Sequence, residues 1–136
     1  MTADELMTPD PETLTPDDTV RDAMDLLYSL GVRHIPIVRR GRLVGMVSDR
    51  DLRDVALPTL TAFEHPEESR KAWARKLGEV MHGDVISVGP EEDAAEIIDL
   101  MIDHKVGAIP VVDPDSEELV GIVSYIDVLR VCRDLV

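Results

Sequence analysis

An internal repeat constrains the fold of this chain more than any other feature of its sequence. A shift of 74 residues places nine residues of 7–38 on identical residues, and a shift of 76 adds six more from 43–51. The change of two residues falls between two apolar runs, where a longer turn costs little free energy. We therefore expect two copies of one folding unit, at 6–54 and 80–133, joined by a helical linker at 55–79.

Both copies predict the same order of elements, β-α-β-β-α. A proline followed by acidic residues is typical of a helix start, so helices are expected to begin at Pro16, with Thr15 as the cap, and at Pro90. Gly31 is expected to end the first of these helices. The remaining elements are extended pieces at 12–14 and 85–88, strand pairs at 34–38 with 43–47 and 108–112 with 119–123, and second helices from Ser48 and Ser124.

One copy is too small to be stable alone, because about 50 residues bury little surface and its sheet would leave one apolar face uncovered. The expected fold class is therefore α+β, with two β-α-β-β-α repeats packed with pseudo-two-fold symmetry into one module. In the linker, Pro58 is expected to end the preceding helix and Pro66 to begin another. Trp73 and Leu77 would share one side of that helix, with Trp73 as a packing anchor rather than a ligand platform, and Gly78 would end it.

Charge excludes some classes of partner. The 136 residues include 28 acidic and 14 basic side chains, a formal net charge of −14, which repels nucleic acids and anionic membranes. No apolar run approaches the ~18 residues of a membrane span, and no signal peptide is apparent. The single cysteine, Cys132, fits a reducing cytoplasm and is expected to be a small apolar filler.

The most informative motif is Ser-x-x-Asp, which follows the last strand of each copy as Ser48/Asp51 and Ser124/Asp127. One interpretation is structural, because this spacing matches a capping box at a helix N-terminus. The other is functional. A helix N-terminus favours phosphate, and a carboxylate can accept hydrogen bonds from both hydroxyls of a ribose. The preceding glycine would let a ligand approach the strand closely.

The repeat resembles the cystathionine-β-synthase (CBS) domain, which occurs in tandem pairs called Bateman modules. The resemblance covers nearly the whole chain and rests on the segments 7–8, 33–38 and 45–53, the helix at Pro16, and 80–81, 108–112 and 121–127. It implies a regulatory module that binds AMP, ADP, ATP or S-adenosylmethionine in two clefts between the repeats, without a required cofactor.

The resemblance also implies a role for individual residues. In the first cleft Ser124 and Asp127 would hold the ribose, and Arg33 and His34 would approach the phosphate. The residues lining its adenine would be Ile122, Thr15, Val20 and Val32. The second cleft would use Ser48 and Asp51, with Met46, Gly89, Ala94 and Val106. Since Gly107 and Ala108 replace Arg33 and His34 in the second copy, the first cleft is expected to be the main site, with Arg50 and Arg53 as compensating cations in the second.

Catalysis finds no support in the sequence, which contains no nucleophile elbow, Walker loop or HExxH motif. The four histidines, at 34, 65, 82 and 104, lack metal-ligand spacing, so no metal site is expected. Two hypotheses remain: a nucleotide-sensing module, and a ligand-independent scaffold that dimerises.

The resemblance implies a homodimer, and two helical stripes are candidates for its surface as well as for the core. They are Val20/Ala23/Met24/Leu27 and Ala94/Ile97/Ile98/Met101. With no catalytic domain attached, the module is expected to act on a separate, unidentified target protein. The net charge divides as −4 over 1–54, 0 over 55–79 and −10 over 80–136, so local cations decide whether a phosphate can bind.

Overall fold

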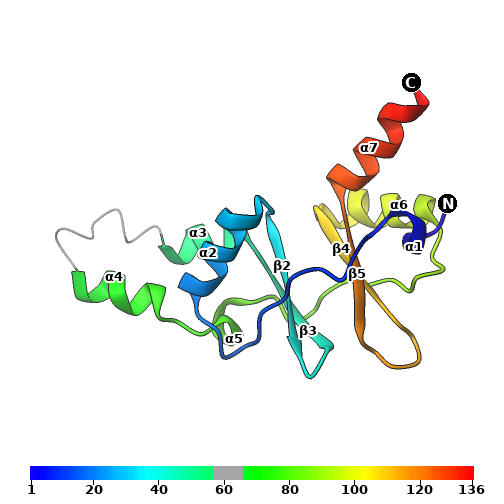
Figure 1. Cartoon of the computed structure of the whole chain (residues 1–136). Helices are drawn as coiled ribbons and strands as arrows, with labels where there is room; N and C mark the ends of the chain where they lie inside the picture. Colours follow the sequence, from blue (N-terminus) through cyan, green and yellow to red (C-terminus); the bar gives the residue numbers. More distant parts are fainter. Residues whose placement is uncertain (57–65) are drawn as a thin grey trace. The chain divides into compact units, whose positions relative to one another are not determined.

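The computed structural model describes residues 1–56 and 66–136, and Figure 1 shows its elements along the chain. The first half contains α1 (Ala3–Leu6), β1 (Thr8–Pro9), α2 (Val20–Leu30), β2 (His34–Arg39), β3 (Arg42–Ser48) and α3 (Asp49–Ala56). The second half contains α4 (Pro66–Trp73), α5 (Leu77–Val80), α6 (Ala94–His104), β4 (Ala108–Val112), β5 (Leu119–Ser124) and α7 (Tyr125–Leu135). Contacts divide the chain into two compact units: unit 1 (Met1–Pro11, Gly41–Leu43 and Val85–Val136) and unit 2 (Glu12–Arg40 and Val44–Asp84).

Unit 1 is built on a three-stranded sheet in the order β1-β5-β4. Both pairings are antiparallel, with Thr8 opposite Ile122 and Ile109 opposite Val123. Val88 adds a parallel bridge to Val111 at the other edge. The core of this unit consists of Ala3, Leu6, Val88, Ile97, Ile109, Val111 and Val123.

Unit 2 repeats this plan around the sheet β2-β3. Leu14 makes a parallel bridge to Ile37, and His82 makes an antiparallel bridge to Met46. Its core consists of Val20, Ala23, Leu27, Ile35, Ile37, Val47, Leu52 and Leu77. The predicted strand pairs are therefore confirmed in both repeats, because apolar runs bounded by turn residues fix them locally.

Each unit is completed by the segment that precedes the other repeat in the sequence. Met1–Pro11 brings α1 and β1 to the sheet of the second repeat, and α5 with His82 joins the sheet of the first. Thr8 and His82 are equivalent under the shift of 74 residues, and both lie beside the last strand of their unit. The repeat in the sequence and the compact unit in space are therefore not the same stretch of chain.

The glycine before each Ser-x-x-Asp motif serves this close approach. A Cβ at Gly121 would lie 3.1 Å from the carbonyl oxygen of Thr8, and one at Gly45 would lie 3.1 Å from that of His82. The side chains of Met7 and Met81 come closer still. These two glycines leave room for the chain's own outer segment, whereas the sequence suggested room for a ligand.

The predicted helix starts at Pro16 and Pro90 are wrong. Helix α2 begins at Val20, where Thr19 and Asp22 form a capping box. A capping box satisfies two free N–H groups at once, which Thr15 cannot do from its position. The residues before it form a turn, in which the Thr15 N–H donates to the Asp18 carboxylate at 2.7 Å. Helix α6 likewise begins at Ala94.

The predicted end of the first helix is confirmed. Gly31 follows α2 with φ +66°, and its N–H donates to the Leu27 carbonyl. This left-handed conformation is the one in which glycine commonly ends a helix.

The linker follows the prediction only at its start. Helix α4 begins at Pro66 as expected but ends at Trp73, so Leu77 does not share a helix with Trp73. Gly78 does not end α4. It lies inside α5, where its N–H donates to the Pro16 carbonyl at 3.0 Å. The predicted helix break at Pro58 falls outside the described residues.

Two expectations about burial also change. Cys132 is exposed on α7, so it is not an apolar filler. In the stripe on α2, Val20, Ala23 and Leu27 are buried in the core of unit 2, which removes them as a dimer surface. In the stripe on α6, Ile97 is fully buried. None of the described helices is long and apolar enough to cross a membrane.

Candidate functional site

In unit 1 the Ser124/Asp127 pair stands at the junction of β5 and α7. The Asp127 Oδ2 atom accepts the Ser124 N–H at 2.8 Å and the Ser124 hydroxyl at 3.0 Å, while the Asp127 N–H donates to Ser124 Oγ at 3.3 Å. This is a complete capping box, so the structural interpretation of the motif is confirmed. One carboxylate oxygen, Oδ1, takes no part in the cap.

In unit 2 the Ser48/Asp51 pair has the same geometry at the junction of β3 and α3. The Asp51 Oδ2 atom accepts the Ser48 N–H at 2.9 Å, and the Asp51 N–H donates to Ser48 Oγ at 3.1 Å. The Asp51 side chain is only 18% exposed. Both repeats thus present a half-buried carboxylate at a helix N-terminus, where backbone N–H groups and the helix dipole favour a bound anion.

The remaining oxygen of each carboxylate has a different neighbour in the two units. Asp51 Oδ1 lies 2.9 Å from His82 Nε2. Asp127 Oδ1 accepts the Thr8 hydroxyl at 3.4 Å and lies 3.9 Å from an exposed guanidinium nitrogen of Arg130. Sequence reasoning missed both Thr8 and His82 as site residues. The alignment of the two repeats could have identified them, because they occupy matching positions after Met7 and Met81.

Arg33 and His34 lie close to the Ser48/Asp51 pair. The Asp49 N–H donates to the Arg33 carbonyl at 2.9 Å, which joins the start of β2 to the end of β3. Burial lowers the pKa of His34, although Asp49 and Asp51 oppose this shift and Arg33 adds to it. The structure therefore brings these two residues together with the ribose pair of unit 2, whereas the sequence assigned them to the pair of unit 1.

The cations beside Asp51 in the sequence are on helix α3. Arg50 and Arg53 are both exposed, and Arg53 lies 3.6 Å from Asp49 as a surface ion pair. At the matching positions of α7 stand Ile126 and Leu129, which are 41% and 57% exposed. The helix start of unit 2 is therefore surrounded by charge, and that of unit 1 by apolar side chains.

The predicted adenine-lining residues are distributed over both units. For the first cleft, Ile122 lies in unit 1, while Thr15, Val20 and Val32 lie in unit 2. For the second, Met46 lies in unit 2, while Gly89, Ala94 and Val106 lie in unit 1. Val20 is fully buried in the core and presents no surface to a ligand, whereas Val32 is 42% exposed. Apart from this observation on Val20, these assignments stay predictions.

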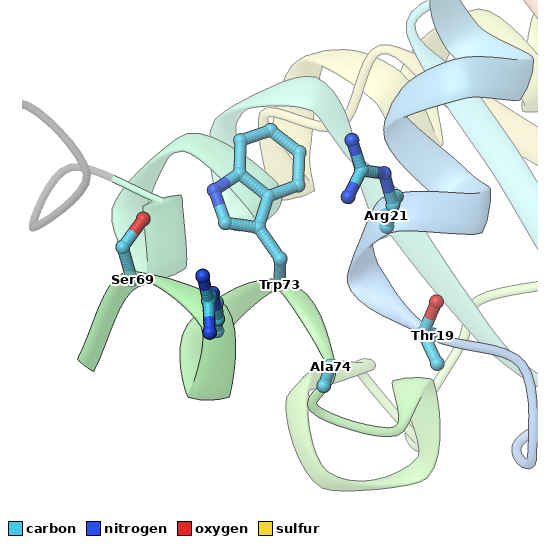
Figure 2. Close-up of a pocket in the computed structure, with 6 residues that line it drawn as sticks. Thr19, Arg21, Ser69, Trp73 and Ala74 are labelled. Atoms are coloured by element: carbon cyan, nitrogen blue, oxygen red, sulfur yellow. The ribbon is translucent and has the colours of Figure 1, made fainter. Parts of the chain in front are cut away.

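Unit 2 also carries a surface hollow of about 480 Å³, shown in Figure 2. Its lining residues are Thr19, Arg21, Ser69, Arg70, Trp73 and Ala74. The guanidinium of Arg21 stands over the Trp73 ring, 6.0 Å from its centroid, within the range of a cation–π interaction. Since Arg21 covers a ring face that a ligand would need, Trp73 serves here as a packing residue between α2 and α4.

Among the described residues, no group of three or more His, Cys, Asp or Glu side chains is placed to hold a metal ion. His65 lies outside these residues.

Comparison with known proteins gives a consistent result. The sequence profile of one family, described as the CBS domain, matches residues 3–57 and 77–134. CBS domain-containing protein YhcV of Bacillus subtilis is 31% identical over 121 residues, which cover 89% of this chain and 78% of that protein. A Vibrio cholerae protein assigned as the acetoin utilization protein AcuB is 37% identical, with a TM-score of 0.80 over 99% of this chain and 92% of the other.

A further solved structure carries a ligand. CBSX2 of Arabidopsis thaliana, solved in complex with AMP, is 27% identical, with a TM-score of 0.81 over 98% of this chain and 97% of the other. These structures confirm the expected α+β fold of two CBS repeats.

Some relatives are much longer than this chain. It is 29% identical to the inosine-5'-monophosphate dehydrogenase of Methanocaldococcus jannaschii over 94% of its own residues, and spans only 23% of that enzyme. It spans 45% of a second protein from the same organism, which is 30% identical.

Proposed function

Because the chain belongs to the CBS-domain family, with one matched copy in each half, we propose that it is a non-catalytic regulatory module that binds an adenosine-containing ligand. The observation that carries this proposal is the pair of half-buried carboxylates, Asp51 and Asp127, each held at a helix N-terminus by its own serine. The relative CBSX2, solved with AMP, supports adenosine as the common part of the ligand.

The proposed chemistry of each pair is recognition of a ribose. The two hydroxyls of the sugar donate hydrogen bonds, and an ionised carboxylate offers about four acceptor positions. The cap uses Oδ2 in both pairs, which leaves Oδ1 for the sugar. The serines fix the rotamer of each carboxylate before a ligand arrives, so little entropy is lost when it binds.

Phosphate groups on the ligand need cations, because the chain has a net charge of −14. We assign this role to Arg33 and His34, with Arg50 and Arg53 as further cations near Asp51. All four residues lie in unit 2. Which of AMP, ADP, ATP or S-adenosylmethionine binds, and whether the Ser124/Asp127 pair is the main site as the resemblance suggests, are the questions the experiment addresses.

The test is a set of calorimetric titrations with these four ligands and adenosine. Asp51→Asn and Asp127→Asn keep a side-chain oxygen that can accept the serine N–H, so the caps are largely retained while the charge is lost. Asp22→Asn is the matched control, because Asp22 makes the same capping box with Thr19 on α2 and belongs to neither pair. We expect affinity to fall at Asp51 or Asp127 and to stay unchanged at Asp22. Equal affinity in all three variants and in the Asp51→Asn/Asp127→Asn double variant contradicts the proposal.

The alternative function is a ligand-independent scaffold that dimerises. It is favoured by the fact that capping alone accounts for the Ser-x-x-Asp motif in both repeats. Exposed apolar side chains on α2 and α7 offer a surface for such a dimer, namely Tyr28, Leu30, Ile126 and Leu129. A thermal-shift screen separates the two functions, since a ligand that binds only the folded chain raises its melting temperature in a saturable way.

The proposal includes a cytoplasmic location and an unidentified target protein. The first is supported by a sequence with a single cysteine, since cytoplasmic proteins seldom depend on disulfides. The second is supported by the presence of CBS-domain relatives within longer proteins such as the dehydrogenase, where the module is one part of the chain.

A further inference from the structure

His82 is held firmly beside the Ser48/Asp51 pair by its backbone. The Met46 N–H donates to the His82 carbonyl at 3.1 Å, and the His82 N–H donates to the Met46 carbonyl at 3.0 Å. This double bond places the side chain next to the helix start two residues beyond Met46. There the imidazole Nε2 reaches Asp51 Oδ1 at 2.9 Å, while the side chain as a whole stays 71% exposed.

Oδ1 is the oxygen that the cap leaves free. A ribose hydroxyl that donates to Asp51 must therefore compete with the imidazole for the same atom. When the ring nitrogen carries a proton it donates to the carboxylate, and the bond is stronger still if the imidazole is charged. The exposed side chain can rotate away, so His82 would weaken binding rather than abolish it.

The second repeat provides an internal comparison. Thr8 stands where His82 stands, and its hydroxyl lies 3.4 Å from Asp127 Oδ1, a long contact for an O–H donor. Arg130 is 3.9 Å away with a side chain that is 68% exposed, so it contributes little. Among the described residues, the free oxygen of Asp127 is thus held less closely than that of Asp51.

We propose that His82 is a specificity-determining residue that competes with the ribose for Asp51, so that the exchange of Thr8 for His82 makes the two half-sites unequal. The Ser124/Asp127 pair then binds adenosine more tightly than the Ser48/Asp51 pair. This inference rests on the proposed function, because it assumes that the two carboxylates receive a ribose.

The test exchanges the two residues and measures the affinity for adenosine, which carries no phosphate and so does not depend on the nearby cations. In an Asp127→Asn background, where Asp51 provides the remaining carboxylate, His82→Thr is expected to tighten binding about two- to fivefold, the range of one exposed ion pair. In an Asp51→Asn background, Thr8→His is expected to weaken binding by a similar factor. His82→Gln retains a donor and should bind close to the parent.

Each outcome separates the two levels of the argument. If His82→Thr leaves the dissociation constant unchanged or raises it while Asp51→Asn still lowers binding, the role of His82 is refuted and the proposed function stands. If the Asp51→Asn/Asp127→Asn double variant binds adenosine as well as the unmodified chain, the proposed function falls and the role of His82 falls with it. A circular dichroism spectrum and melting temperature for each variant exclude loss of fold as the cause.

Discussion

A substitution of Gly121 by alanine tests how closely the outer segment of the chain approaches the sheet of unit 1. The added Cβ would lie 3.1 Å from the Thr8 carbonyl oxygen, which is a backbone atom of β1 and cannot rotate away. It would also overlap the flexible side chain of Met7. Overpacking of this kind costs about 1–3 kcal/mol, because either the strand or the side chain must move.

The structure supplies a matched control. A Cβ at Gly83 would meet nothing within 4 Å, so Gly83→Ala is expected to change the free energy of unfolding by less than about 0.5 kcal/mol. Urea denaturation followed by circular dichroism measures both variants. The double variant Gly121→Ala/Met7→Ala should recover part of the loss relative to Met7→Ala alone, since the methionine contact disappears while the backbone contact remains.

The result that refutes this reasoning is a Gly121→Ala variant as stable as Gly83→Ala. It would mean that β1 does not lie against β5 as described. A full recovery in the double variant would instead show that Met7, and not the backbone of Thr8, sets the spacing.

Three further predictions follow from burial and charge. Since burial lowers the pKa of His34 from 6.5, the unfolded chain binds a proton more readily there, so stability should fall as the pH drops below 6.5, and His34→Asn should flatten this part of a melting-temperature profile; a parallel profile contradicts the shift. Leu77→Ala should cost about 2–5 kcal/mol in urea denaturation, because Leu77 is fully buried in the core of unit 2, and a loss near zero would show that α5 does not pack there. Cys132 is exposed on α7, so a thiol reagent should label the folded chain at nearly the rate of the denatured chain, and strong protection would place the residue in an interface.

The strands were the most predictable part of the fold. The predicted run 108–112 coincides with β4, and the run 34–38 differs from β2 only by including Arg39. These segments are apolar, rich in valine and isoleucine, and bounded by turn residues, so local sequence determines them. The helix starts were less predictable, because proline with acidic neighbours also suits the turn that precedes α2.

The exchange of segments between the repeats could not be predicted from local sequence. Strand β1 has only two residues, Thr8 and Pro9, both exposed, and so carries no alternating pattern. Its position depends on pairing with β5, more than 110 residues away in the chain. The same reason explains the candidate site: the Ser-x-x-Asp pairs were visible because they are local, whereas their neighbours Thr8 and His82 come from distant segments.

The origin of β1 and α5 has a consequence for how the chain must fold. A fragment cut at the linker would keep one full copy of the repeat but would lose the strand and helical turn that finish its sheet, and Leu77 or Leu6 from its core. Neither half is thus an autonomous folding unit, and the contacts that close each one span most of the polypeptide. Such high contact order slows folding. It also makes complementation possible, since two separately expressed halves hold between them every segment that each lacks.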